Sequence, residues 1–160
     1  MAAAGLLTLR LTLAFVLVSH GGHILFALGA GGGLGPGGPE QSAAAFSRAG
    51  LEPGMLIAVL VGSVQFVGGL LIALGLMARW ASAAAIGIQA ILLWKTQAQW
   101  GFYINWIGDS TRGHGMEFSI VLIGALLCLF LTGSGDWSFD GRRAHRATSR
   151  ALGRARLRGH

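Results

Sequence analysis

Two histidines, His20 and His23, are the side chains of this sequence best suited to proton chemistry, and both lie in a long apolar stretch. Because they are three positions apart, a helix would place them on one face. Glu117 begins a later apolar stretch, and a carboxylate beside an imidazole keeps proton transfer available near neutral pH. Ionisable groups inside long apolar segments are costly to bury, so we take them as candidates for function.

Other polar side chains accompany these groups further along the chain. Gln65 and Gln89 fall near the middle of two more apolar stretches. We expect the ionisable and loop residues to converge beneath one membrane surface and to form a polar pocket for a quinone ring. The residues expected in that pocket are His20, His23, Lys95, Asn105, Trp106 and Glu117.

A hydrogen-bonded network at the membrane surface would account for the same residues without any ligand. In that interpretation Glu117 caps a helix, Lys95 extends toward the surface, and the histidines bond within the network. Two histidines and one glutamate do not have a diagnostic metal-ligand spacing, so we predict no metal site and no intrinsic cofactor. The single cysteine, Cys128, excludes an intramolecular disulfide and is expected to be buried in its apolar run.

The composition indicates which elements must position these residues. Hydrophobic residues make up 53% of the chain and charged residues 11%, against about 25% charged in ordinary soluble domains. Half of the charged residues lie between Asp136 and His160. The remainder of the chain cannot present a soluble surface, which excludes a soluble enzyme domain and a disordered chain.

Four apolar stretches are long enough to cross a bilayer as helices, which takes about 20 residues each. Alternation with period two is absent, so strands are not expected. We predict an all-α polytopic membrane protein with a compact four-transmembrane-helix bundle in residues 1–140, packed through small-residue faces. A short amphipathic helix is expected in the first outer loop, from Ser42 to Ala49. The four predicted spans are residues 6–28, 55–77, 81–100 and 116–132.

The basic tail, residues 141–160, sets the predicted orientation. Together with Arg10 and Arg79, the tail places most of the positive charge on one side of the membrane. The positive-inside rule therefore predicts that both termini lie on the cytoplasmic side of a bacterial inner membrane. In a helix the arginines spaced by four would form one stripe against anionic lipid headgroups. A tail that only fixes topology is the alternative, and no nucleic-acid partner is expected. The striped residues are Arg142, Arg146, Arg150, Arg154 and Arg158.

Six parts of the sequence carry a family resemblance: Arg10, Ser19 to Phe26 with its His-Gly step, Gly68 to Arg79, Gly101 to Trp106, His114 to Phe118, and Gly133 to Asp140. In their order and spacing, over about residues 10–140, they resemble the DoxX family of small four-helix membrane proteins. Two positions depart from the family pattern: His23 stands where a basic residue is frequent, and Gln65 where a glutamate is frequent.

The resemblance implies a membrane subunit of a redox complex, either accessory or quinone-associated, because relatives include the membrane subunit of thiosulfate:quinone oxidoreductase. Protein partners within the membrane are implied as well. Two alternatives stay open at this point. The chain could be a non-catalytic scaffold of a larger respiratory or photosynthetic assembly, or a carrier of small solutes or lipids lined by Gln65 and Gln89.

Overall fold

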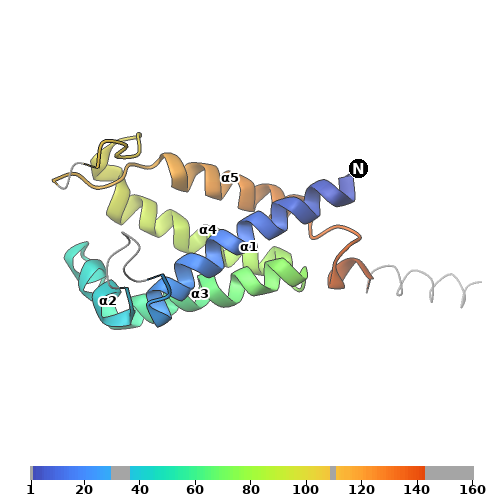
Figure 1. Cartoon of the computed structure of the whole chain (residues 1–160), viewed down its shortest axis with the longest axis horizontal. Helices are drawn as coiled ribbons and strands as arrows, with labels where there is room; N and C mark the ends of the chain where they lie inside the picture. The colour runs from blue at the N-terminus through green and yellow to red at the C-terminus, as the bar shows by residue number, and fades with distance from the viewer. Residues whose placement is uncertain (1, 30–36, 109–110, 143–160) are drawn as a thin grey trace, which may run out of the picture.

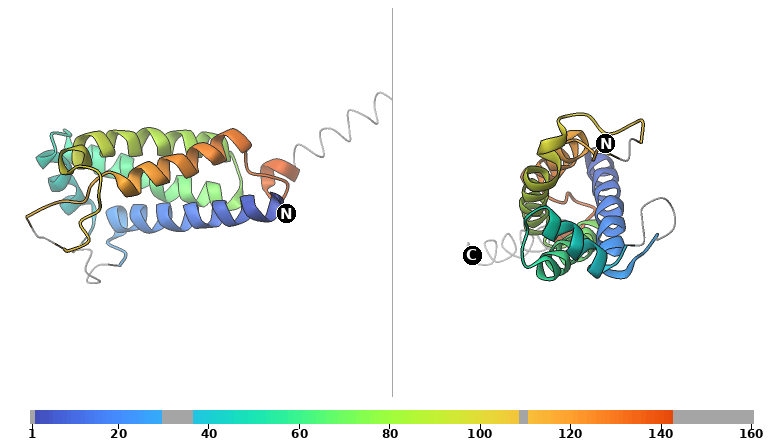
Figure 2. Two further views of the ribbon diagram at one scale, coloured as in Figure 1. Left: turned by 90° about the horizontal axis from the view of Figure 1, so that it is seen from above. Right: turned by 90° about the vertical axis from the view of Figure 1, so that its left-hand side faces the viewer.

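The computed structural model describes residues 2–29, 37–108 and 111–142. Within those ranges all regular structure is helical and no strand occurs. Four helices lie side by side in a ring, each in contact with its neighbours, and α2 lies across one end of that ring (Figures 1 and 2). The helices are α1 (Ala2–Phe26), α2 (Pro39–Arg48), α3 (Gly54–Leu74), α4 (Ala78–Leu92) and α5 (Glu117–Thr132).

The predicted third span, 81–100, is not one continuous α-helix. The α-helix begins earlier, at Ala78, and gives way to a π-helical segment, Leu93–Gln97, and a 3-10 turn, Ala98–Trp100. The amphipathic helix also begins earlier than expected, because Pro39 occupies its first turn. Ser42 is therefore inside that helix rather than at its N-cap, and its hydroxyl donates to the Gly38 carbonyl at 2.8 Å.

Glycines allow α1 and α3 to approach closely. A Cβ on Gly21 would lie 2.7 Å from the Gly62 carbonyl oxygen, and one on Gly69 would lie 2.8 Å from the Val18 side chain. Real Cβ atoms do not come this near to a neighbour. In a bilayer, where lipid is as apolar as leucine, this backbone proximity gives helices the dispersion contacts that hold them together.

The outer surface of the helices is as apolar as the interior. Leu17, Ile72 and Leu126 fill the core, while Phe15, at 75% exposure, and Val121, at 68%, project outward. Water does not tolerate apolar patches of this extent, whereas lipid does. Within the described ranges, Ala3–Phe26 and Gly54–Leu74 are long and apolar enough to cross a membrane, and Glu117–Thr132 is a shorter apolar helix. Cys128 is also exposed, so the expectation that it is buried is wrong.

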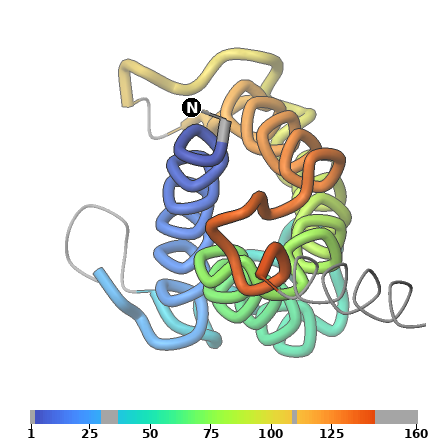
Figure 3. The backbone as a smooth tube through the Cα atoms, turned by 90° about the vertical axis from the view of Figure 1, so that its right-hand side faces the viewer, coloured from blue at the N-terminus to red at the C-terminus, as the bar shows by residue number. Residues whose placement is uncertain are grey.

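The opposite end of the ring, near the N-terminus, is closed by the segment that follows α5 (Figure 3). Arg10 holds this segment in place and is only 2% exposed. Its guanidinium donates to the carbonyls of Ile72 and Ala73 at 3.0 and 2.7 Å, and to those of Ser134 and Trp137 at 2.9 and 3.0 Å. Arg10 is therefore a buried structural residue rather than the surface charge that the orientation argument assumed.

Candidate functional site

A cavity of about 160 Å³ lies where α1, α3, α4 and α5 meet. Its polar lining consists of His20, Gln65, Gln89 and Gln97, and Phe118 closes one side with its ring centroid 6.1 Å from that of His20. An apolar cavity of about 150 Å³ holds one benzene-sized ring. This cavity therefore has room for a single small ring, surrounded by groups that can form hydrogen bonds. The remaining lining residues are Leu17, Ile24, Leu92 and Leu122.

Two of the three cavity glutamines are buried residues, and two of the three have an amide oxygen that is unpartnered within the described part of the chain. Gln65 and Gln89 are each 6% exposed. The amide of Gln89 donates to the Ser119 hydroxyl at 2.7 Å. The Oε1 atoms of Gln65 and Gln97 are buried and have no hydrogen-bond partner among the described residues. An unsatisfied buried acceptor costs about 1–3 kcal/mol, and both of these oxygens belong to residues that line one cavity, which makes this cavity the candidate site.

Gln97 reaches the cavity because of the π-helical segment. In a regular α-helix, eight positions would turn Gln97 about 80° away from the face of Gln89. The wider π turn between Leu93 and Gln97 removes much of that rotation, and both side chains line the cavity. Such π turns occur frequently at functional sites. Gln97 was not predicted from the sequence, because no local signal indicates the π turn, and Ser119 was not predicted either.

His23 lies beside the first loop rather than in the cavity lining. Its Nδ1 is 3.1 Å from the Leu28 carbonyl oxygen, which requires the Nδ1-protonated tautomer. Its own carbonyl accepts from the Gly38 amide at 2.9 Å. A Cβ on Gly37 would lie 2.7 Å from the imidazole ring. These contacts give His23 a role in joining the end of α1 to the start of α2.

Glu117 anchors the loop that precedes α5, which carries the aromatic residues Phe102, Tyr103 and Trp106. Its carboxylate accepts from the Ile104 amide at 3.2 Å, and its own amide donates to the Phe102 carbonyl at 2.9 Å. In the same loop Asn105 donates to the Arg112 carbonyl at 2.8 Å. Trp106 is 80% exposed, and Lys95 is exposed on the π-helical segment. None of these four residues lines the cavity.

The residues predicted to line one pocket therefore lie in different parts of the structure. The structure brings His20 together with the two glutamines expected at the midplane, and it places the other candidates around the loops. No group of three or more potential metal ligands occurs within the described ranges. Of the predicted lipid-contacting arginines, Arg142 is exposed with its guanidinium 5.0 Å from the Phe139 ring centroid. Arg146, Arg150, Arg154 and Arg158 lie outside the described residues.

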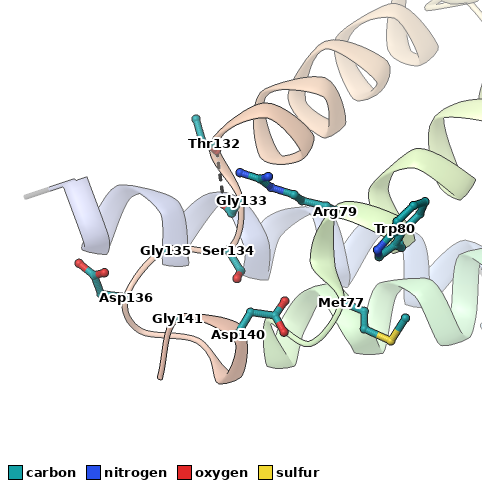
Figure 4. Close-up of a pocket in the computed structure, with 10 residues that line it drawn as sticks. All are labelled: Met77, Arg79, Trp80, Thr132, Gly133, Ser134, Gly135, Asp136, Asp140 and Gly141. Atoms are coloured by element: carbon teal, nitrogen blue, oxygen red, sulfur yellow. Dashed lines mark hydrogen bonds between the residues drawn. The ribbon is translucent and has the colours of Figure 1, made fainter. Parts of the chain in front are cut away.

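A second, more open pocket of about 510 Å³ lies at the closed end of the ring (Figure 4). Arg79 and Trp80 enter it from the start of α4, and Asp136 and Asp140 from the segment after α5. The Asp140 carboxylate accepts from the Ala78 amide at 3.3 Å. Ala78 begins α4, and the N-terminus of a helix favours an acidic side chain nearby. Charges of both signs therefore meet in this pocket.

Within the described residues the helices have apolar outer faces and enclose a polar cavity, which is the arrangement of an integral membrane protein. The chain belongs to the DoxX family, which matches residues 5–97. It is also 33% identical over 119 residues to an uncharacterized membrane protein of Mycobacterium tuberculosis, an alignment covering 72% of this chain and 69% of the relative. No solved structure matches the chain. The resemblance to the DoxX family is thereby confirmed.

Proposed function

We propose that this protein binds the ring of a quinone or quinol in the cavity lined by His20, Gln65, Gln89 and Gln97, as a subunit of a membrane redox complex. The observation that carries this proposal is the pair of unpartnered amide oxygens, on Gln65 and Gln97, beside a ring-sized cavity. In this proposal all four of α1, α3, α4 and α5 cross the membrane, and the α2 end faces outward.

Glutamine suits both redox states of such a ring. A quinone presents two carbonyl acceptors, and a quinol presents two hydroxyl donors. A glutamine amide can offer either its N–H groups or its oxygen, and it changes between them by rotating about one bond. Gln65 on α3 and Gln97 beyond α4 stand on different elements of the cavity, so each can bond one end of the ring.

His20 is the group of the cavity that can exchange protons. Imidazole has an ordinary pKa near 6.5, so it can both accept and release a proton under physiological conditions. Reduction of the bound ring takes up two electrons and two protons. We assign the electrons to a redox partner subunit and the proton exchange to His20. The residue at position 65 is a glutamine, so it orients the ring without supplying protons.

The tail supports the proposed orientation and contacts. Among the described residues, Arg10, Arg79 and Arg142 lie toward the closed end and Arg48, Lys95 and Arg112 toward the α2 end, so these six do not decide the topology. The six arginines after residue 142 favour a cytoplasmic location of both termini under the positive-inside rule. The same tail would meet anionic headgroups on that side of the inner membrane.

Ligand titration of the purified protein in detergent tests the proposal. We expect a short-chain benzoquinone or naphthoquinone to bind saturably in calorimetry. The double variant Gln65→Leu, Gln97→Leu should raise the Kd for the quinone by at least about tenfold, which corresponds to a loss of roughly 1.4 kcal/mol in binding free energy. Gln99→Leu is the matched control, because Gln99 is exposed and outside the cavity lining.

Two results would contradict quinone binding. One is the absence of saturable binding of either quinone by the wild-type protein. The other is an equal loss of affinity in Gln99→Leu and in the double variant, which would locate binding outside the cavity. Thermal unfolding of each variant shows whether it is folded, and the leucine variants should unfold no earlier than wild type since they remove unsatisfied oxygens.

A further inference from the structure

An apolar groove of about 420 Å³ runs between α3 and α4 on the outer surface of the ring. Small residues hollow it out: Gly68 on α3 faces Ala81 and Ala84 on α4. The groove extends along α3 from Leu71 to Ser63, a distance of about 12 Å at the rise of an α-helix. That length accommodates a substantial part of one acyl chain.

Trp80 joins this groove to the charged pocket at the closed end. The side chain lines both cavities, and it is 74% exposed. Tryptophan is enriched at the level of lipid headgroups, because its ring is amphipathic. The junction therefore has an apolar channel on the membrane side and a polar pocket on the terminal side, which is the polarity of a phospholipid molecule.

The charges of the pocket indicate a zwitterionic headgroup. Arg79 bonds the Leu131 carbonyl only at a long 3.4 Å, and guanidinium groups bind phosphate in a bidentate manner. Asp140 and Asp136 line the same pocket (Figure 4). The Asp140 carboxylate would repel a headgroup with net negative charge, while a primary ammonium can donate a hydrogen bond to it.

We propose that these two cavities form one binding site for a phospholipid with a phosphate and a primary-amine headgroup, with one acyl chain in the α3–α4 groove. Arg79 binds the phosphate, Asp140 binds the ammonium, and Trp80 marks the boundary between headgroup and chain. This site is separate from the inner cavity and does not depend on quinone binding.

Native mass spectrometry of the detergent-purified protein tests the site. The protein is titrated with phosphatidylethanolamine, phosphatidylcholine and phosphatidylglycerol carrying identical chains. We expect one phosphatidylethanolamine to be retained in preference to the other two. Gly68→Leu fills the groove and should lower its retention about tenfold, which corresponds to about 1.4 kcal/mol. Arg79→Gln should lower the retention of all three lipids, because each carries a phosphate, whereas Asp140→Asn should abolish the preference for phosphatidylethanolamine.

Gly87→Leu is the matched control, because a Cβ on Gly87 meets nothing within 4 Å and Gly87 is outside the groove lining. It should retain the lipid as wild type does. Equal retention of the three lipids by wild type would overturn the proposal. Unchanged retention in Gly68→Leu would also overturn it. So would a change of oligomeric state in that variant without loss of lipid, because a helix of a second copy of the chain would then be the occupant of the groove.

Discussion

The guanidinium of Arg10 donates a hydrogen bond of 2.9 Å to the backbone carbonyl of Ser134, 124 positions further along the chain. This bond joins the first helix to the segment after the last one. The same guanidinium bonds two carbonyls at the end of α3, where a helix carries partial negative charge; the Ile72 carbonyl also accepts from the Gly75 amide at 3.0 Å. One buried arginine thus ties three parts of the chain together at the closed end.

Arg10→Gln is expected to destabilise the protein by at least about 3 kcal/mol, because it removes charged donors from four carbonyls. Thermal unfolding in detergent measures this as a lower Tm. The control is Arg48→Gln, which removes an exposed arginine bonded within its own helix and should change stability by less than about 0.5 kcal/mol. Equal Tm values for the two variants would show that the buried bonds contribute nothing.

Gly75 ends α3 in the left-handed region, at φ 64°. Gly75→Ala should therefore lower stability by at least about 2 kcal/mol, since its Cβ would also lie 2.8 Å from the Arg10 guanidinium. Met77 has a similar φ of 50° without being glycine, so Met77→Gly should raise stability by up to about 1 kcal/mol. Two shifts of Tm in the same direction would contradict this account of the turn.

Gly21 and Gly87 offer a second pair with opposite expectations. Gly21→Ala places a methyl group against the α3 backbone, and overpacking of this kind costs about 1–3 kcal/mol. Gly87→Ala has open space around it and gains helix propensity, up to about 1 kcal/mol. Unfolding curves of the two variants should move to opposite sides of wild type; a neutral Gly21→Ala would mean that α1 and α3 are not in close contact.

Glu117→Gln distinguishes a loop anchor from a proton carrier. Glutamine keeps an oxygen for the Ile104 amide, so quinone affinity should change by less than about twofold. Glu117→Ala removes that acceptor and should accelerate amide hydrogen exchange at Ile104. An affinity loss in Glu117→Gln as large as that of the cavity double variant would instead make the carboxylate part of the ligand site.

The apolar stretches of the sequence indicated where helices would form, but not which faces would turn inward. Because α3 and α5 are apolar on all sides, the spacing of their apolar residues does not show which face of each helix points into the bundle. Polar residues inside those stretches were the informative signal, and His20, Gln65 and Gln89 line one cavity. Polar residues at helix ends did not indicate the cavity. His23 and Glu117 form hydrogen bonds with the backbone of loops instead.

Two further features depended on tertiary structure. Gln97 enters the cavity only through a π turn that no residue of the segment Leu93–Gln97 specifies on its own. The role of Arg10 depends on Ser134 and Trp137, and no local pattern links them to the first helix. A surface position was the ordinary expectation for an arginine beside a terminus, because arginine is rarely buried without partners.

Photo-crosslinking with an azido-quinone, followed by peptide mapping, tests the central claim most directly. The account predicts labelling of residues around the inner cavity, on the peptides that contain His20, Gln65 or Gln97, and protection by an excess of unlabelled quinone. The Gln65→Leu, Gln97→Leu variant should lose most of this label, and Gln99→Leu should keep it. Label confined to the outer α3–α4 groove, or label that excess quinone does not displace, would contradict a quinone site between the helices.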